Sequence, residues 1–349
     1  MDNTMKAALF YGDKEDMRVE SIEIPEIGDG DVLLKVKACG ICGSDARYYF
    51  NGNEPRYKRP VILGHELTAV IEKVGKRVNN YKVGERVALA PIYGCGCCNS
   101  CLSGYENLCR DVVIFGINMD GGFADYMLIP EQGVSRGVLL KINDNVSDEA
   151  GTMLESLSCV LHGQRKLNIQ PGDSVAVFGA GPIGIFHMLT AKKIGAGKVV
   201  IIDVIENRLK EAEAFGADFL VNGSLNDWQS HVLRFFGENG ANHVITAAPS
   251  LTAVENSLKI VNTGGKILVF GGIPKNNLLS VDPNFIHYNE ITILGSVDAT
   301  IDDFKRSAEL AVYLDLDRFV SFRYRLDDIK QGLEKIKNKE GIKTIIKFD

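Results

Sequence analysis

Residues 174–187 read SVAVFGAGPIGIFH, and this stretch decides the fold of the second half of the chain. Its first five residues are an apolar run that predicts a buried strand, and the residues from Pro182 to Ile194 predict a helix. Between them stand Gly179, Gly181 and Gly184, in the spacing GxGxxG. The first glycine permits a tight turn, the second lets the backbone approach a pyrophosphate, and the third lets helix and strand pack closely. We therefore predict a dinucleotide-binding loop here.

The residues around this loop indicate which dinucleotide it binds. Pro182 suits the first helical turn, because its missing N–H costs nothing there. Asp203 ends the next predicted strand, nineteen residues after Gly184, where a carboxylate accepts hydrogen bonds from an adenosine ribose and repels a 2′-phosphate. NAD is therefore favoured over NADP, although the nearby Arg208 could pair with a phosphate, pack over the adenine or lie on the exposed helix face. The alternative is an ordinary turn with a capping Asp. The predicted cofactor-binding residues are Gly179, Gly181, Pro182, Ile183, Gly184, Asp203 and Arg208.

The alternation of short apolar runs with amphipathic stretches continues beyond this loop. The further predicted strands are Lys198–Asp203, Phe219–Val221, His243–Ala247, Lys266–Phe270 and Ile291–Leu294, with a helix at Glu206–Phe215. Six strands with intervening helices predict a doubly wound parallel sheet. A helix at Asp302–Leu314 and a closing strand at Lys343–Phe348 follow.

The first 150 residues or so have a different pattern. Short predicted strands are joined by Gly and Pro turns, and helical periodicity is scarce; examples are Lys6–Phe10, Asp31–Ala38, Leu67–Val74 and Glu85–Ala90. This pattern predicts a β-rich, partly closed barrel-like domain. The fold class is therefore α/β, with two domains.

The composition excludes some kinds of partner. The 349 residues carry 39 Lys and Arg against 45 Asp and Glu, a net charge of −6, which favours neither a nucleic acid nor an anionic membrane. The N-terminus has no pattern of a secretory signal, and no run approaches the ~18 apolar residues of a membrane helix. We expect a cytoplasmic protein that acts on a small molecule.

The cysteines are clustered. Of the eight, five fall within residues 95–109, which in a cytosolic protein indicates metal binding rather than disulfides. Four thiolates at Cys95, Cys98, Cys101 and Cys109 suit a closed structural zinc site, and an iron–sulfur cluster is the chemical rival. The spare thiol of Cys97 leaves open which four residues bind.

Five motifs, taken in order, resemble the signatures of zinc-containing medium-chain dehydrogenases. They are Gly40–Asp45, Gly64–Glu66, the Cys95–Cys109 segment, Leu154–Ser158 and Gly179–Gly184. The nearest likeness is to the sorbitol (L-iditol), threonine and galactitol-1-phosphate dehydrogenase branch, and it covers essentially the whole chain.

The resemblance implies an architecture. It predicts a GroES-like zinc catalytic domain over residues 1–157, completed by residues 296–349, and a Rossmann NAD-binding domain over residues 158–295. It also implies a homo-oligomer, either a tetramer or a dimer.

The resemblance also assigns roles to residues. Cys42 and His65 would be ligands of a catalytic zinc, with Glu66 or Glu155 completing the set, because in this branch the two carboxylates can exchange roles. The chain would then hold two zinc ions, one catalytic and one structural. Zinc would lower the pKa of a substrate hydroxyl as a Lewis acid, and Ser44 would be the first proton acceptor.

Three further residues are expected at the substrate. Tyr48 and Phe115 lie in segments that line the substrate cleft in relatives. Arg47 stands where many relatives carry a His that ends the proton relay, and an Arg cannot act as a base. The proton would then leave through water held by Glu66 or Glu155.

Arg47 also opens a cluster of positive charge with Arg56, Lys58 and Arg59. Either this segment attracts an anionic substrate such as a polyol phosphate, or the loop is solvated and Arg47 pairs with the cofactor pyrophosphate. The expected function is oxidation of a secondary alcohol or polyol by NAD. The alternatives are a sugar alcohol phosphate or L-threonine-type dehydrogenase, a zinc-free quinone reductase-like protein, and a non-catalytic NAD(H)-binding protein.

Overall fold

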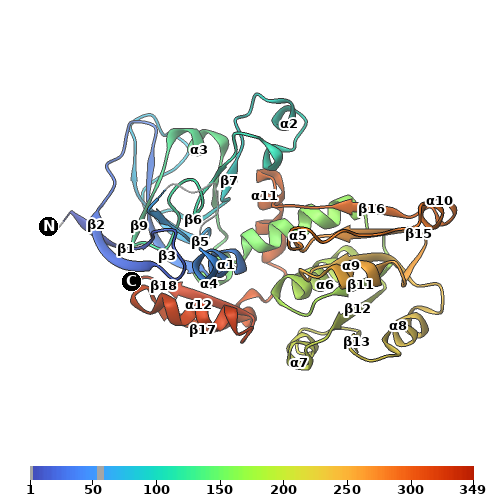
Figure 1. The fold of residues 1–349 in the computed structure, drawn as a ribbon. Helices are drawn as coiled ribbons and strands as arrows, with labels where there is room; N and C mark the ends of the chain where they lie inside the picture. The colour runs from blue at the N-terminus through green and yellow to red at the C-terminus, as the bar shows by residue number, and fades with distance from the viewer. Residues whose placement is uncertain (1–2, 53–58) are drawn as a thin grey trace. The chain divides into compact units, whose positions relative to one another are not determined.

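The computed structural model describes residues 3–52 and 59–349, which form two compact units. The first unit comprises Met1–Ser158 and Ala299–Asp349, and the second comprises Cys159–Asp298. These bounds lie one and three residues beyond the predicted domain bounds. Each unit is described by itself, and Figure 1 traces its elements.

The first unit is built on β-sheets, as a GroES-like fold requires. One sheet has the order β10-β6-β5-β3-β18-β17, with β9 also paired to β3, and two smaller sheets have the orders β2-β1-β4 and β7-β8. The strands are β1 (Thr4–Phe10), β2 (Met17–Glu23), β3 (Val32–Gly40), β4 (Val61–Ile62), β5 (Glu66–Val74), β6 (Arg86–Leu89), β7 (Ile92–Tyr93), β8 (Val113–Ile114), β9 (Tyr126–Ile129), β10 (Leu139–Lys141), β17 (Val320–Arg325) and β18 (Lys343–Lys347). Gly40 of β3 pairs with Ile345 of β18, so the end of the chain completes this unit.

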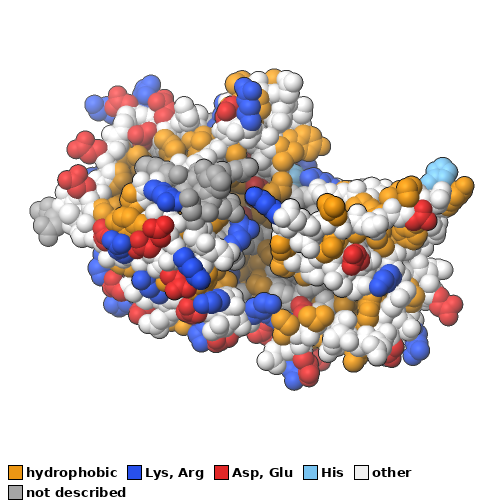
Figure 2. Space-filling view, in the orientation of Figure 1, with side chains coloured by type: hydrophobic (Ala, Val, Ile, Leu, Met, Phe, Trp, Pro, Cys, Tyr) orange, Lys and Arg blue, Asp and Glu red, His pale blue; other side chains and the backbone are white. Residues whose placement is uncertain are grey.

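Short helices connect these strands. They are α1 (Gly43–Asn51), α2 (Asn99–Leu102), α3 (Glu131–Arg136), α4 (Asp148–Gly151), α11 (Ile301–Ala311), α12 (Ile329–Lys337) and the 3₁₀ turns η1 (Glu106–Leu108), η2 (Leu316–Phe319) and η3 (Leu326–Asp328). Helix α5 (Leu154–Leu167) runs from the first unit into the second. On the face shown in Figure 2, acidic and basic side chains are interspersed. Within residues 3–52 and 59–349, no helix is both long and apolar enough to cross a membrane.

The second unit is the predicted doubly wound sheet. All neighbouring strands are parallel, in the order β13-β12-β11-β14-β15-β16. The strands are β11 (Ser174–Phe178), β12 (Lys198–Asp203), β13 (Phe219–Asn222), β14 (Ala241–Thr246), β15 (Val261–Val269) and β16 (Thr292–Gly295), and the helices are α6 (Pro182–Ile194), α7 (Glu206–Glu213), α8 (Trp228–Phe236), α9 (Leu251–Ser257) and α10 (Pro283–Asn289). The strand order reverses between β11 and β14, which is where such sheets bind dinucleotides.

The structure corrects several predicted boundaries. The helix predicted at Glu206–Phe215 ends at Glu213, because the chain turns there into Gly216, which has a φ of +82°. The helix predicted at Asp302–Leu314 spans Ile301–Ala311. Helix α1 arises in a region expected to be almost free of helices. A capping box between Cys42 and Asp45 starts it by satisfying backbone N–H groups that would otherwise lack acceptors.

Candidate active site and metal centres

Asp45 organises the first group of predicted ligands. Its buried carboxylate accepts the backbone N–H of Cys42 at 2.9 Å and that of Gly64 at 3.3 Å. Its Oδ1 also lies 3.6 Å from Nδ1 of His65, a contact that orients the ring as carboxylates behind metal-binding histidines do. One carboxylate thus holds Cys42 and His65 in place, although 22 residues separate them in the sequence.

The same contacts govern the charge of His65. Burial by itself lowers the pKa of His65, but the Asp45 carboxylate and the Cys42 side chain outweigh burial and raise this pKa well above its ordinary value. The Cys42 side chain is hydrogen-bonded to His65. A thiol and an imidazole in contact form the pair of donors that zinc prefers, and zinc would displace the proton between them.

Glu66, at the start of β5, has both carboxylate oxygens engaged. Oε1 accepts the hydroxyl hydrogen of Ser156 at 2.7 Å, and Oε2 is ion-paired with Nζ of Lys343. The Ser156 hydroxyl also lies 3.2 Å from Oε2 of Glu155, so it links the two predicted carboxylates. The structure therefore brings Glu66 and Glu155 together and adds two residues, Ser156 and Lys343, that the sequence did not predict.

Lys343 is a buried cation beside these acidic groups. Only 1% of Glu66 and 5% of Lys343 is exposed, so the ion pair is shielded from water. Burial lowers the pKa of Lys343, but the charges of Glu66, Cys42 and Glu155 outweigh burial and raise it above its ordinary value. Gly40 makes room for the pair, because a Cβ there would lie 2.5 Å from the Glu66 carboxylate. The available signal was a Lys at the start of the last predicted strand, just before Ile345 and Ile346.

The predicted substrate residues lie on α1 and beside β8. Arg47 is exposed, and its Cζ lies 5.1 Å over the ring of the buried Tyr48, with Nη2 at 3.4 Å from the Tyr48 hydroxyl. Ser44, one turn earlier, is half-buried. Phe115 is fully buried and packs against Tyr93, so contact with a substrate would require it to move. Arg59 is exposed, and Arg56 and Lys58 lie outside the described residues.

Four cysteine side chains form a second group, one that could hold a metal ion. The sulfur atoms of Cys95, Cys98, Cys101 and Cys109 all lie within 4.8 Å of one another, and Cys97 is not part of the group. Sulfurs bound tetrahedrally at ~2.3 Å from one ion are about 3.8 Å apart. The Sγ atoms of Cys98 and Cys109 are separated by 3.8 Å. This spacing fits a single zinc ion; an iron–sulfur cluster would hold its thiolates further apart.

The protein environment favours charge on one of these thiols and disfavours it on another. Backbone N–H groups of Cys97 and Cys98 lower the pKa of Cys95 to about 6, whereas burial raises the pKa of Cys101 to about 12. Four thiolates this close need a cation among them, which zinc supplies. We name residues 95–109 the cysteine lobe; Figure 1 shows it, marked by α2, standing out from the sheets of the first unit.

The glycine loop of the second unit has the predicted geometry. Gly179 has a φ of +113°, and a Cβ on Gly184 would lie 1.7 Å from the carbonyl oxygen of Gly179, so neither position tolerates a side chain. Gly181 is the N-cap of α6, and Pro182 occupies its first turn. The helix therefore presents its N-terminus to the loop, as an anion-binding site requires.

Asp203 closes this loop from the neighbouring strand. Its carboxylate accepts the backbone N–H of Ala180 at 2.7 Å and that of Ile205 at 2.8 Å. It borders a cavity of about 160 Å³ at the carboxyl ends of the strands, whose lining includes Phe178, Gly179, Ile202, Gly223, Ala248 and Thr252. Arg208 lies 3.4 Å from Glu211 on the same helix. The cavity and the loop together have the form of a dinucleotide site.

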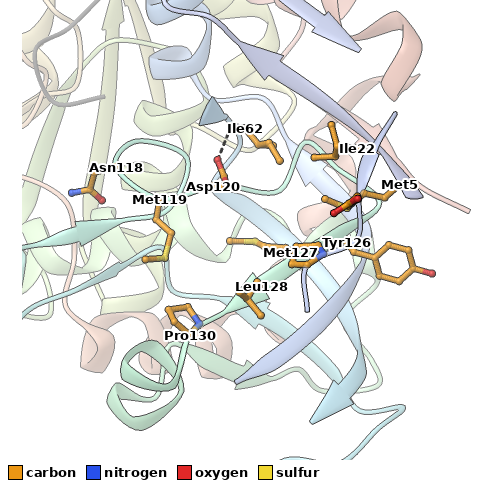
Figure 3. A pocket seen from close by; sticks show the side chains of 13 residues that line it. Met5, Ile22, Ile62, Asn118, Met119, Asp120, Tyr126, Met127, Leu128 and Pro130 are labelled. Carbon is orange, nitrogen blue, oxygen red and sulfur yellow. Dashed lines mark hydrogen bonds between the residues drawn. The ribbon is translucent and has the colours of Figure 1, made fainter. Parts of the chain in front are cut away.

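The first unit has a further cavity of about 470 Å³ (Figure 3). Its lining includes Met5, Ile22, Ile62, Met119, Tyr126, Met127 and Leu128. Asp120 points toward Ile62 and accepts its backbone N–H at 3.1 Å. None of the predicted site residues is among those that line this cavity, so it is separate from both metal groups.

Two family models match the chain. The model of the alcohol dehydrogenase GroES-like domain matches residues 28–139, and that of the zinc-binding dehydrogenases matches residues 182–313. The first match lies within the first unit, and the second covers most of the second unit and extends into residues 299–313 of the first.

Individual relatives match over nearly the full length. The chain is 32% identical to a sorbitol dehydrogenase of Bacillus subtilis, over 95% of this chain and 93% of that enzyme. It is 33% identical to an L-galactonate-5-dehydrogenase of Escherichia coli, over 93% and 94% of the two chains. A structure from Sinorhizobium meliloti, described as a zinc-binding dehydrogenase bound to NADP, superimposes with a TM-score of 0.90 at 30% identity, covering 99% of both chains.

Proposed function

The chain belongs to the family of zinc-containing medium-chain dehydrogenases, and from this membership we propose that it oxidises a secondary alcohol of a polyol with NAD. The observation that carries the proposal is that Cys42 acts on the charge of His65 and that Ser156 links Glu66 to Glu155, all in one unit of a chain whose other unit has a dinucleotide loop. A non-catalytic NAD(H)-binding protein would not need this set of donors. The homo-oligomeric state and the cytoplasmic location stay predictions.

We assign Cys42, His65 and Glu155 to a catalytic zinc and the four lobe cysteines to a structural one. Glu155 is preferred to Glu66 because both oxygens of Glu66 are engaged by Ser156 and Lys343. A zinc ion at the catalytic site supplies Lewis acidity toward a substrate oxygen. A single zinc per chain would contradict the two-site assignment.

The protein must also remove a proton from the alcohol. Ser44, two residues after Cys42, is proposed as the first acceptor. Arg47 cannot continue the relay because a guanidinium stays protonated. We propose that the proton leaves through water held by Glu155, which is half-buried and is joined to Glu66 by the Ser156 hydroxyl.

The preference for NAD over NADP rests on Asp203. Its carboxylate is held at the carboxyl end of β12 by two backbone N–H groups, where a negative charge repels a 2′-phosphate. The similar structure from Sinorhizobium meliloti is bound to NADP, so the preference of this chain for NAD needs an experimental test.

We expect Asp203→Asn to lower the ratio of kcat/KM with NAD to kcat/KM with NADP about tenfold or more. The reason is that ~1.4 kcal/mol of removed repulsion corresponds to a factor of ten. Asparagine keeps the size and an acceptor oxygen and removes the charge. The measurement is kcat/KM with NAD and with NADP. Asp218→Asn is the matched control, because Asp218 also accepts a backbone N–H, from Val199, but does not line the cavity. A wild-type protein that prefers NADP would refute the assignment.

The substrate class depends on Arg47. Sorbitol, named in one relative, is a neutral polyol, and L-galactonate, named in another, is a polyol acid. We place a neutral polyol first. The exposed guanidinium of Arg47 on the ring of Tyr48 favours an anionic polyol as second candidate, because an Arg can bind a carboxylate or phosphate through two parallel hydrogen bonds.

A screen with NAD tests both candidates. It compares sugar alcohols, their phosphates, aldonates, inositols and simple diols. We expect turnover of a neutral polyol to exceed that of its phosphate or acid. We also expect Arg47→Ala to leave KM for the polyol within about twofold, since a neutral polyol carries no charge for the guanidinium to attract. Arg110→Ala, which changes an exposed Arg directly after the cysteine lobe, is the control. If the anionic compound is preferred, with a KM that rises in Arg47→Ala and with added salt, the second candidate is correct.

A further inference from the structure

The cysteine lobe contains one thiol more than a zinc ion needs. Cys97 is exposed, and its Sγ lies 3.6 Å from Sγ of Cys95, which belongs to the four-sulfur group. Gly96, between them, has a φ of +77°, and this turn brings both thiols to one side. The Arg136 guanidinium lies over Gly96 and donates to the carbonyl oxygen of Cys95, which holds the turn in place.

We propose that Cys97 is a redox-active thiol which, on oxidation by a peroxide, forms a disulfide with Cys95 and so releases zinc from the cysteine lobe. The proposal rests on the assignment of zinc to the lobe. Cys97 is the residue that a peroxide reaches, because it is the exposed thiol of the five, and the Cys95 thiol is in contact with it at 3.6 Å.

The oxidation is balanced in two steps. The Cys97 thiolate attacks a peroxide oxygen, the O–O bond breaks, and the products are a Cys97 sulfenic acid and hydroxide. The Cys95 sulfur then attacks the Cys97 sulfur, an S–S bond forms, the S–O bond breaks, and the leaving hydroxide takes a proton to become water. Two thiols and one hydrogen peroxide thus yield one disulfide and two waters, and the zinc loses a thiolate ligand.

Release of zinc would also affect residues outside the cysteine lobe. The turn η1 ends at Cys109, one of the four ligands, and within η1 the carboxylate of Glu106 accepts the backbone N–H of Ile301 at 2.6 Å. Ile301 is the first residue of α11, so Glu106 satisfies an N–H at a helix start. When Cys109 loses the metal, η1 loses its anchor, and the first unit should lose stability with it. The oxidised lobe would therefore lower the stability of the unit that holds the catalytic residues.

The test uses the full-length, zinc-loaded protein and hydrogen peroxide. Released zinc is followed with a chromogenic chelator, and the cysteine pairing is mapped by mass spectrometry of the lobe peptide. We expect the wild type to release one zinc per chain as a Cys95–Cys97 disulfide forms. We expect Cys97→Ser to release zinc at a rate at least about tenfold lower. A dithiol with added zinc should reverse the change. Cys159→Ser, a half-buried thiol of the second unit, is the control and should behave as the wild type.

The outcomes separate this proposal from the one it rests on. Equal zinc release from the wild type and Cys97→Ser, or a disulfide that joins other cysteines, overturns the redox role while the zinc assignment stands. A protein purified with no zinc on the four lobe cysteines overturns both.

Discussion

Cys42→Ala is expected to lower kcat/KM by about 10³-fold or more, because a Lewis acid contributes several kcal/mol and each ~1.4 kcal/mol is a factor of ten. The reason is local: Cys42 contributes a thiolate at the proposed catalytic zinc, and alanine supplies no donor. The variant should stay folded, since Asp45 still accepts the backbone N–H of residue 42 and starts α1. Metal analysis should find about one zinc per chain instead of two, and circular dichroism should match the wild type.

Cys98→Ala is the matched control for this variant. It removes a thiolate from the cysteine lobe, where a structural zinc contributes directly to folding. It should therefore also lose one zinc, but with a lower melting temperature rather than a selective loss of turnover. A Cys42→Ala protein that keeps two zinc ions, or keeps activity within tenfold of the wild type, would contradict the catalytic assignment.

Lys343→Met is expected to lower the free energy of unfolding by about 3–5 kcal/mol, the usual cost of leaving one partner of a buried ion pair uncompensated. The Glu66 carboxylate would remain buried, with the Ser156 hydroxyl as its hydrogen-bond donor and without its ion-pair partner. Methionine has nearly the same length, so the loss reports the charge rather than the packing. Urea unfolding of the zinc-loaded protein measures the change.

Lys347→Met provides the matched control on the same strand. Lys347 pairs with Glu149 at 3.0 Å, but about half of its side chain is exposed, so its loss should cost only about 0–1 kcal/mol. Lys343→Arg, which keeps a cation near Glu66, should recover part of the stability. If the two methionine variants lose equal stability, the buried Lys343–Glu66 pair contributes no more to stability than the exposed Lys347–Glu149 pair, and the prediction is wrong.

Much of the fold could be predicted because the responsible signals are local. The GxGxxG loop, the short apolar strands, and Asp203 at the end of β12 each depend on residues close along the chain. The doubly wound sheet was therefore predicted correctly, with strand ends shifted by a few residues. Helix α1 was missed because its start depends on a capping box at Cys42 and Asp45 rather than on apolar periodicity.

The sequence by itself determined the β-rich domain, the doubly wound sheet, the dinucleotide loop and the types of metal donor, since periodicity, glycine spacing and clustered cysteines act over short separations. Only the tertiary structure decided which groups meet. It separated Cys97 from the four lobe ligands, placed Asp45 behind His65, and paired Lys343 with Glu66 across 277 residues. For the pair of Lys343 and Glu66, the physical reason is that β3 pairs with both β18 and β5, a register between distant segments that no local pattern encodes.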